Sequence, residues 1–216
     1  MAQTKTPSRA KRSYHKGHVA QDLLAAAARI LKNESVEALS VRRLAREVGV
    51  TPANFYNHFP SLEDVLLTLA AEGFDTIAAD TRRCMEKSKT RKEGLIESSV
   101  GFVNFAIANK QVFRIMFGQV PDAVHNEKFR IASDKSFAQL VRFIYGEWRY
   151  DRENLIETHH RAAVAYGMFA LVYGLARNII EDQFEFETGG KAEIRRFVEE
   201  VMKTYADGTA AKVLAD

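Results

Sequence analysis

The chain has 216 residues, yet it contains only one cysteine, four prolines and no long uninterrupted apolar run. Cys84 cannot form an intramolecular disulfide, and no second thiol stands beside it as a zinc or redox motif requires, so we interpret it as a helix-packing residue. The longest apolar stretches, such as 23–28 and 162–172, are too short or too interrupted to predict a membrane span. The N-terminus also lacks the apolar segment of a signal peptide. These absences predict a soluble, cytoplasmic protein.

The charge is unevenly distributed along the chain. Residues 1–60 hold ten Lys or Arg and four Asp or Glu, whereas the remainder holds 21 basic and 24 acidic side chains. Residues 1–17 carry five basic side chains, no acidic ones and almost nothing apolar, which predicts a flexible basic arm. A basic first quarter on a mildly acidic remainder indicates a nucleic-acid-binding module joined to a second domain.

Apolar residues recur at helical spacing in segment after segment, and no stretch alternates in the manner of a strand for long. The sequence therefore predicts an all-α fold of about nine helices. Ser40, Thr51 and Ser61 are predicted N-caps, Gly49 ends a short helix, and Pro52 suits a first helical position. The predicted helices run over about 18–32, 41–48, 52–59, 62 onward, 92–108, 111–117, 127–150, 153–181 and 191–206.

The stretch "SVRRLAREVGVTPANFYNHFP" places two short helices around a Gly-centred turn. This is the helix-turn-helix arrangement, in which the second helix enters the major groove of DNA. Residues with apolar side chains face inward, including Leu44, Phe55 and Phe59. The outward residues of the second helix are small, polar or flat, which lets them approach base edges and phosphates. They are Pro52, Ala53, Asn54, Tyr56, Asn57 and His58.

The segment "ILKNESVEALSVRRLAREVGVTPANFYNHFPSLEDVL" resembles the DNA-binding region of the tetracycline-repressor (TetR/AcrR) transcriptional regulators over about residues 18–75. Two further stretches, "VNFAIANKQVFRIMFG" and "FALVYGLARNI", resemble a subgroup with a Trp-x-x-x-His-Gly signature, of which only Gly174 matches here. The resemblance implies a flexible arm at 1–17, a three-helix DNA-binding domain at 18–62, and a larger helical domain for effector binding and dimerisation at 63–216.

The resemblance also implies roles for individual residues. Arg42 and Asn54 would read bases, while Tyr56 and His58 would hold phosphates. Many relatives carry a lysine near the start of the fourth helix, where this chain has Leu62, and the basic arm with Lys11, Arg12 and Lys16 is the alternative source of positive charge here. The full predicted DNA-binding set is Ser40, Arg42, Arg43, Thr51, Pro52, Ala53, Asn54, Tyr56, Asn57 and His58.

The second half of the chain suits dimerisation and ligand binding. The helix over 153–181 is rich in Ala and Gly, and the next carries a one-sided apolar stripe from Ile194 to Tyr205. Two such helices from each of two subunits would form a four-helix bundle. Large apolar side chains in the middle helices would line a cavity for a small apolar or amphipathic effector. The predicted lining is Phe102, Phe105, Phe113, Met116, Phe117, Phe137, Trp148, His159, Tyr166, Phe169 and Tyr173.

The expected function is a ligand-responsive repressor that binds a palindromic operator as a homodimer in the bacterial cytoplasm, at the nucleoid. The alternative is a DNA-binding protein without a small-molecule effector, which is constitutive, activating or controlled by another protein. No metal-ligand spacing, phosphate-binding loop or nucleophile motif is found, so we expect no cofactor, no metal and no enzymatic activity. A membrane-surface protein is disfavoured because Tyr14 is the only apolar anchor in the arm.

Overall fold

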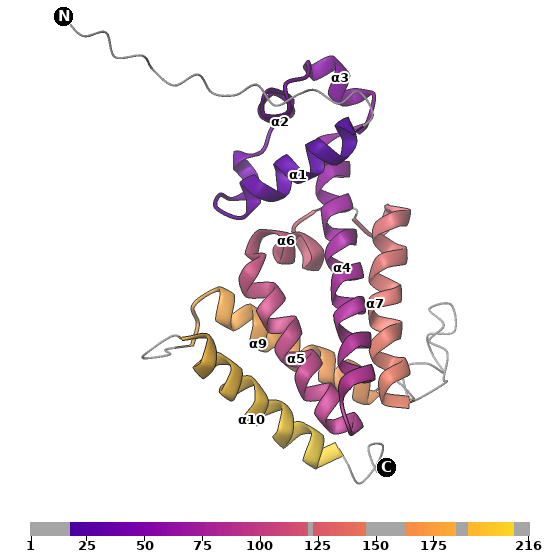
Figure 1. Ribbon diagram of the computed structural model, residues 1–216, viewed down its shortest axis with the longest axis vertical. Coiled ribbons are helices and arrows are strands. Elements are labelled where there is room, and N and C mark those ends of the chain that lie inside the picture. The colour runs from indigo at the N-terminus through magenta and orange to yellow at the C-terminus, as the bar shows by residue number, and fades with distance from the viewer. Residues whose placement is uncertain (1–17, 121–122, 146–162, 185–189, 210–216) are drawn as a thin grey trace, which may run out of the picture.

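The computed structural model describes residues 18–120, 123–145, 163–184 and 190–209, and every structural statement below concerns these residues. All of their regular elements are helical. Helices α1–α3 form a small head at one end of an elongated molecule, and α4 runs from this head along the length of the remainder, called here the body (Figure 1). The α-helices are α1 (Val19–Leu31), α2 (Val41–Val48), α3 (Pro52–Tyr56), α4 (Leu62–Lys87), α5 (Arg91–Ala108), α6 (Lys110–Arg114), α7 (Glu127–Tyr145), α9 (Ala163–Ile180) and α10 (Lys191–Thr209).

The predicted caps of the head are confirmed. The hydroxyls of Ser40, Thr51 and Ser61 each accept the backbone N–H three residues on, at 3.1–3.2 Å. Gly49 follows α2 with φ = 81°, a left-handed conformation that costs glycine little, and Pro52 occupies the start of α3. Because these caps fix both ends of the turn, the sequence determines the helix-turn-helix geometry locally.

Two helices are shorter than predicted. The helix predicted to reach Phe59 ends at Tyr56, and tight turns follow in which His58 N–H bonds to Phe55 O at 2.9 Å. Pro60 disfavours a helical conformation at Phe59, so this helix could not have continued beyond that residue. The helix predicted over 111–117 is α6, which gives way after Arg114 to a π-type turn, η2 (Ile115–Gln119), where Gly118 has φ = 125°.

The body packs around α4 and α5. Helix α4 lies along α7 on one side and against α5 on another, while α9 and α10 pack on α5 (Figure 1). At Gly73 of α4, a β-carbon would lie 2.6 Å from the sulfur of Met116, so the side chain of Met116 packs directly on the backbone of α4 here. Cys84, near the end of α4, is half-buried, and this burial raises the pKa of its thiol.

Helix α9 is, within the described residues, the one helix long and apolar enough to cross a membrane. The expectation that its apolar stretch is too short or interrupted for this is therefore corrected. Seven of its residues lie in the core: Ala165, Met168, Val172, Leu175, Ala176, Ile179 and Ile180. Packing against the other helices of the body thus accounts for the apolar composition of α9.

Candidate DNA-binding surface and effector cavity

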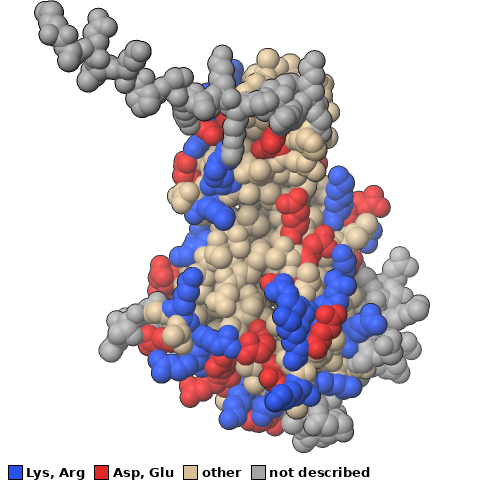
Figure 2. Space-filling view, in the orientation of Figure 1, with Lys and Arg blue, Asp and Glu red and all other residues tan. Residues whose placement is uncertain are grey.

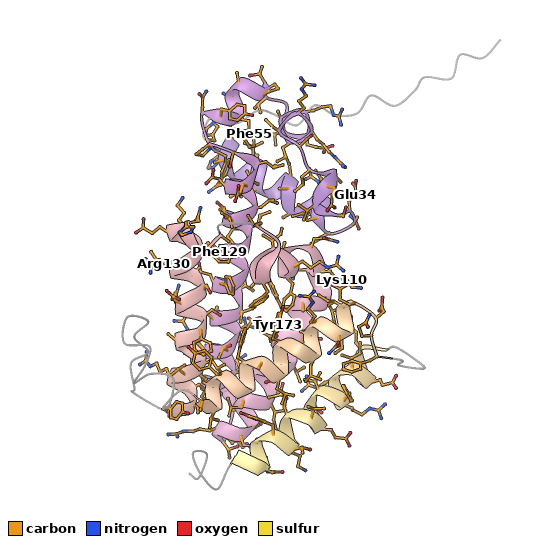
Figure 3. The ribbon with its side chains drawn as sticks, turned by 180° about the vertical axis from the view of Figure 1, so that it is seen from behind. Glu34, Phe55, Lys110, Phe129, Arg130 and Tyr173 are labelled. Carbon is orange, nitrogen blue, oxygen red and sulfur yellow. The ribbon has the colours of Figure 1, made fainter. Side chains whose placement is uncertain are left out.

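The head is built around a single ring. Phe55 of α3 is fully buried together with Leu23 of α1, Leu44 of α2 and Val65 of α4. Its ring also contacts Phe59, with 6.0 Å between centroids, and Tyr56 edge-on at 5.4 Å. Phe55 therefore anchors α3 in the apolar core to which α1, α2 and the start of α4 also contribute, and Figure 3 shows its place in the head.

The opposite side of α3 faces solvent. Thr51, Pro52, Ala53, Asn57 and His58 are exposed, and Tyr56 is 57% exposed, the largest value for a big apolar side chain among the described residues. A surface of small and flat side chains can come close to a base edge or a phosphate. The geometry of these residues is therefore that of a groove-entering helix.

Asn54 differs from its neighbours on α3. Its side chain is half-buried, and the amide oxygen Oδ1 is buried without a hydrogen-bond partner among the described residues. An unsatisfied buried oxygen costs stability. To read a base, this side chain has to turn outward from the position seen here.

Arg42 and Arg43 have different environments although they are adjacent on α2. The guanidinium of Arg43 donates to both carboxylate oxygens of Glu34, at 2.8 and 2.6 Å, and to the carbonyl of Ala38 at 3.1 Å. This pairing lowers the pKa of Glu34 and joins α2 to the turn after α1. Arg42 is exposed and makes no ion pair within the part of the chain described. Of the two, Arg42 has the guanidinium available for DNA.

The tip of the head has little charge. Residues 51–60 contain no charged side chain. In Figure 2 blue and red atoms mix over the lower body, and the part of the head that grey atoms leave visible is mostly tan. Leu62 starts α4 half-buried against the core, and Glu63 follows it exposed. Among the described residues of the head, α2 therefore offers positive charge to this surface, at Arg42 and Arg46, and the start of α4 offers none.

Together, the capped helix-turn-helix, its exposed outer face and its position at the end of the molecule define a DNA-binding head on a helical body. The comparisons with known proteins agree with this class. Residues 23–69 match the family described as "Bacterial regulatory proteins, tetR family". The head of this chain is thus similar to the DNA-binding region of that family, and the class that the fold and the match support is a DNA-binding regulator.

Three relatives illustrate the likeness. The "Uncharacterized HTH-type transcriptional regulator YobS" of Bacillus subtilis (strain 168) is 24% identical over 165 residues, which cover 75% of this chain and 79% of that protein. A protein with unknown function from Rhodococcus sp. RHA1 shares the fold with a TM-score of 0.70, at 23% identity over 90% of this chain and 98% of that one. The fatty acid degradation regulator FadR from Bacillus halodurans does so with a TM-score of 0.63, at 14% identity over 87% of this chain and 96% of that one. The subgroup with the Trp-x-x-x-His-Gly signature stays a prediction.

The body contains a cavity of about 460 Å³. Six of the predicted lining residues meet there: Phe102, Met116, Phe117, Phe137, Tyr166 and Phe169. Phe105, Phe113 and Tyr173 are not part of the lining, and Trp148 and His159 lie outside the described residues. Phe113 is fully buried and its ring stacks on that of Tyr173, so both rings pack behind the residues that line the cavity.

Sequence reasoning missed most of the polar lining and part of the apolar lining. The additional residues are Phe74, Ile77, Thr81, Ser98, Ser99, Phe129, Ser133, Asp134, Ser136, Leu140, Met168 and Val172. Serines within amphipathic helices, adjacent in "ESSV" and three residues apart in "SDKS", are the signal that could have found the polar ones.

The turn η2 links this cavity to the segment that follows α9. Phe117 of η2 lines the cavity. Arg114, the residue before η2, donates two hydrogen bonds to the carboxylate of Glu181, which follows α9, at 2.9 and 2.8 Å. The hydrogen bonds from Arg114 lower the pKa of Glu181. Both residues are about one-third exposed, so this contact orients η2 more than it stabilises the fold.

The predicted dimerisation helices bury part of their apolar surface within the subunit. Val198 and Met202 of α10 are buried against the body, and the hydroxyl of Tyr205 donates to the carbonyl of Val164 at 3.1 Å. Ile194, Phe197 and Val201 are only partly covered. Part of the apolar stripe predicted on α10 therefore packs in the core of the subunit, and part of it lies at the surface.

Some of the small residues of α9 are likewise buried within the subunit, and others lie at its surface. Ala165 and Ala176 are buried, and a β-carbon at Gly167 would lie 2.5 Å from the Tyr205 hydroxyl. Ala170 is exposed, and Gly174 has open space where a side chain would be. One face of α9 thus packs against α10, and another is free of contacts from the described residues.

Proposed function

We propose that this protein is a ligand-responsive repressor that binds a palindromic operator as a homodimer. The observation that carries the proposal is the pairing of an exposed helix-turn-helix surface with a cavity of about 460 Å³ whose wall includes α4. Domain boundaries at 17/18 and 62/63 and a location at the bacterial nucleoid, in the cytoplasm, belong to the same proposal.

In this proposal the head contacts DNA through α2 and α3. Arg42 donates to a guanine in the major groove, the commonest specific contact of an arginine. Tyr56 and His58, both exposed, hold phosphates, and the remaining predicted residues of α3 let the backbone approach. Arg43 positions α2 through Glu34 and does not itself read a base.

Dimerisation would use the uncovered faces of α9 and α10. The outer face of α9 offers Ala170 and Gly174, where small side chains permit a second helix to approach closely. Next to it, Ile194, Phe197 and Val201 of α10 leave apolar surface partly exposed. A twofold dimer formed here would present two heads to successive major grooves, which is why a palindromic operator is expected.

Induction would act through α4. This 26-residue helix begins at the head and contributes Phe74, Ile77 and Thr81 to the cavity wall. A ligand that prefers one orientation of α4 by a few kcal/mol would change the population of DNA-binding dimers by orders of magnitude.

A DNA-binding regulator without an effector is the second candidate function, and a filled core in the body would favour it. The cavity is the observation that favours the ligand-responsive repressor.

We expect Arg42→Ala to weaken specific operator binding by about 1–3 kcal/mol and to relax discrimination at one base pair. The reason is that its exposed guanidinium has no ion pair within the described residues and can form a bidentate contact. Competition gel-shift titrations with the operator and with random duplex would measure both affinities at one salt concentration.

Arg43→Ala is the matched control. It removes the same side chain from the adjacent position, but the lost contact is the one with Glu34, so head stability should fall while base discrimination is retained. Tyr56→Phe should weaken binding to all sequences alike, because it removes a phosphate contact. Equal losses on operator and random duplex for Arg42→Ala would exclude a base-reading role.

A further inference from the structure

Helix α2 has two charged stripes outside its buried face. Successive residues of an α-helix lie about 100° apart around its axis, and residues four apart lie one above the other. Arg42 and Arg46 therefore share one stripe of α2. Arg43 and Glu47 share the other. The two stripes have different surroundings, and this difference separates their functions.

The stripe of Arg43 and Glu47 meets the α1 side of the head. Arg43 is bonded to Glu34, in the turn after α1, at 2.6 and 2.8 Å. Glu47 pairs with Arg29 of α1 at 3.4 Å. Each of these two carboxylates thus has an arginine partner, and this stripe of α2 is occupied with contacts inside the head.

The stripe of Arg42 and Arg46 has no such contacts. Arg46 is exposed and forms no ion pair with any residue that the structure describes. Its sequence neighbour Glu47 is the obvious carboxylate for it, but Glu47 is paired with Arg29 instead. The guanidinium of Arg46 is therefore available, as is that of Arg42 one helical turn earlier.

The available stripe belongs to the helix that crosses the DNA backbone. Helix α2 packs against both α1 and α3, and it is the first helix of the helix-turn-helix. In this arrangement the first helix crosses the backbone while the second enters the groove. Two cations one helical turn apart on such a helix can contact the duplex at two points. Arg42 alone would use only one of them.

We propose that Arg46 is a second DNA contact of α2, which binds a backbone phosphate beside the base pair that Arg42 reads. Its guanidinium donates N–H groups to the phosphate oxygens, a charge-assisted contact whose geometry suits arginine. Arg29 assists from α1, because its pairing with Glu47 offsets a negative charge beside Arg46 that would repel the phosphate. This inference rests on the proposed contact of α2 and α3 with DNA.

The salt dependence of binding tests for a phosphate contact. Arg46→Gln should weaken binding to the operator and to random-sequence duplex alike, by about tenfold at a fixed salt concentration. The slope of log affinity against log salt concentration should become shallower by about 0.9 for each bound head, because one phosphate fewer is neutralised. Arg46→Lys keeps the charge and should retain the slope. Fluorescence-anisotropy titrations of labelled duplex over a salt series measure both quantities.

The control variant Arg82→Gln removes a positive charge from the body. Arg82 lies on α4, is exposed and forms no ion pair within the described part of the chain, so its loss should leave the salt slope unchanged. Thermal unfolding should show nearly the wild-type midpoint for Arg46→Gln, because this side chain is exposed and unpaired.

A second pair of variants tests the role of Arg29. Arg29→Gln leaves the Glu47 carboxylate without its partner and should weaken binding to every duplex by about twofold. Adding Glu47→Gln to this variant should restore at least the wild-type affinity, because the repelling charge is then gone.

The outcomes separate this inference from the proposed function. A wild-type salt slope in Arg46→Gln, a loss confined to the operator, or an equal loss in Arg82→Gln would each overturn the inference. In these cases the wild-type protein still binds its operator, and the proposed function stands. A wild-type protein that binds no selected duplex at low salt would contradict both.

Discussion

Replacing Phe55 by alanine is expected to destabilise the head by about 3–5 kcal/mol and to abolish operator binding. Phe55 is fully buried and is the aromatic centre on which α1, α2 and the start of α4 converge with α3. Since α3 has only five residues, it cannot hold its conformation without this contact. Circular dichroism during thermal unfolding and gel-shift titration would measure the two effects.

Tyr56→Ala is the control for Phe55→Ala. Tyr56 is the next residue on the same helix, but its side chain is 57% exposed, so its removal should leave the unfolding temperature nearly unchanged while weakening DNA binding. If Phe55→Ala retained full operator affinity, the buried ring of Phe55 would not be what positions α3. The account of how the head holds α3 would then be wrong.

Ala170→Arg is expected to convert the protein to a monomer and to lower operator affinity by a factor of about 10²–10⁴. Ala170 is exposed on the outer face of α9, so an arginine there is compatible with the folded subunit. Across a twofold interface, however, it would place two long charged side chains where helices need to approach closely. Loss of the dimer separates the two heads, and each half-site is then bound independently.

Analytical ultracentrifugation measures the assembly state of Ala170→Arg, and gel-shift titration measures its affinity. Ala79→Arg is the matched control, since Ala79 is likewise exposed but lies on α4, away from the proposed interface. A dimeric Ala170→Arg variant with normal operator affinity would show that the interface lies elsewhere on the subunit.

The head was predictable because its determinants are local. Ser40, Gly49, Thr51 and Pro52 each act within one helical turn, and the structure confirms the cap or turn expected of them. Pro60 likewise acts locally, since it disfavours a helical conformation at Phe59.

The body was less predictable because its site depends on contacts between distant segments. Aromatic periodicity identified large side chains but could not separate Phe102, on the cavity, from Phe113, behind its wall. The η2 turn depends on Gly118 and on the close approach of Met116 to Gly73, which no single segment reveals. The pairing of Arg43 with Glu34 is a tertiary contact of the same kind, and the sequence did not reveal it although it singled out Arg42 as the base-reading arginine.

The most direct test is hydroxyl-radical footprinting on genomic fragments that the protein selects. Two heads held by a twofold dimer, each with α3 in a major groove, predict two symmetric protected patches centred about one helical turn, 10–10.5 base pairs, apart on one face of the duplex. A single unsymmetrical patch, or no protection of any selected fragment at low ionic strength, would contradict the proposal that paired heads read an operator.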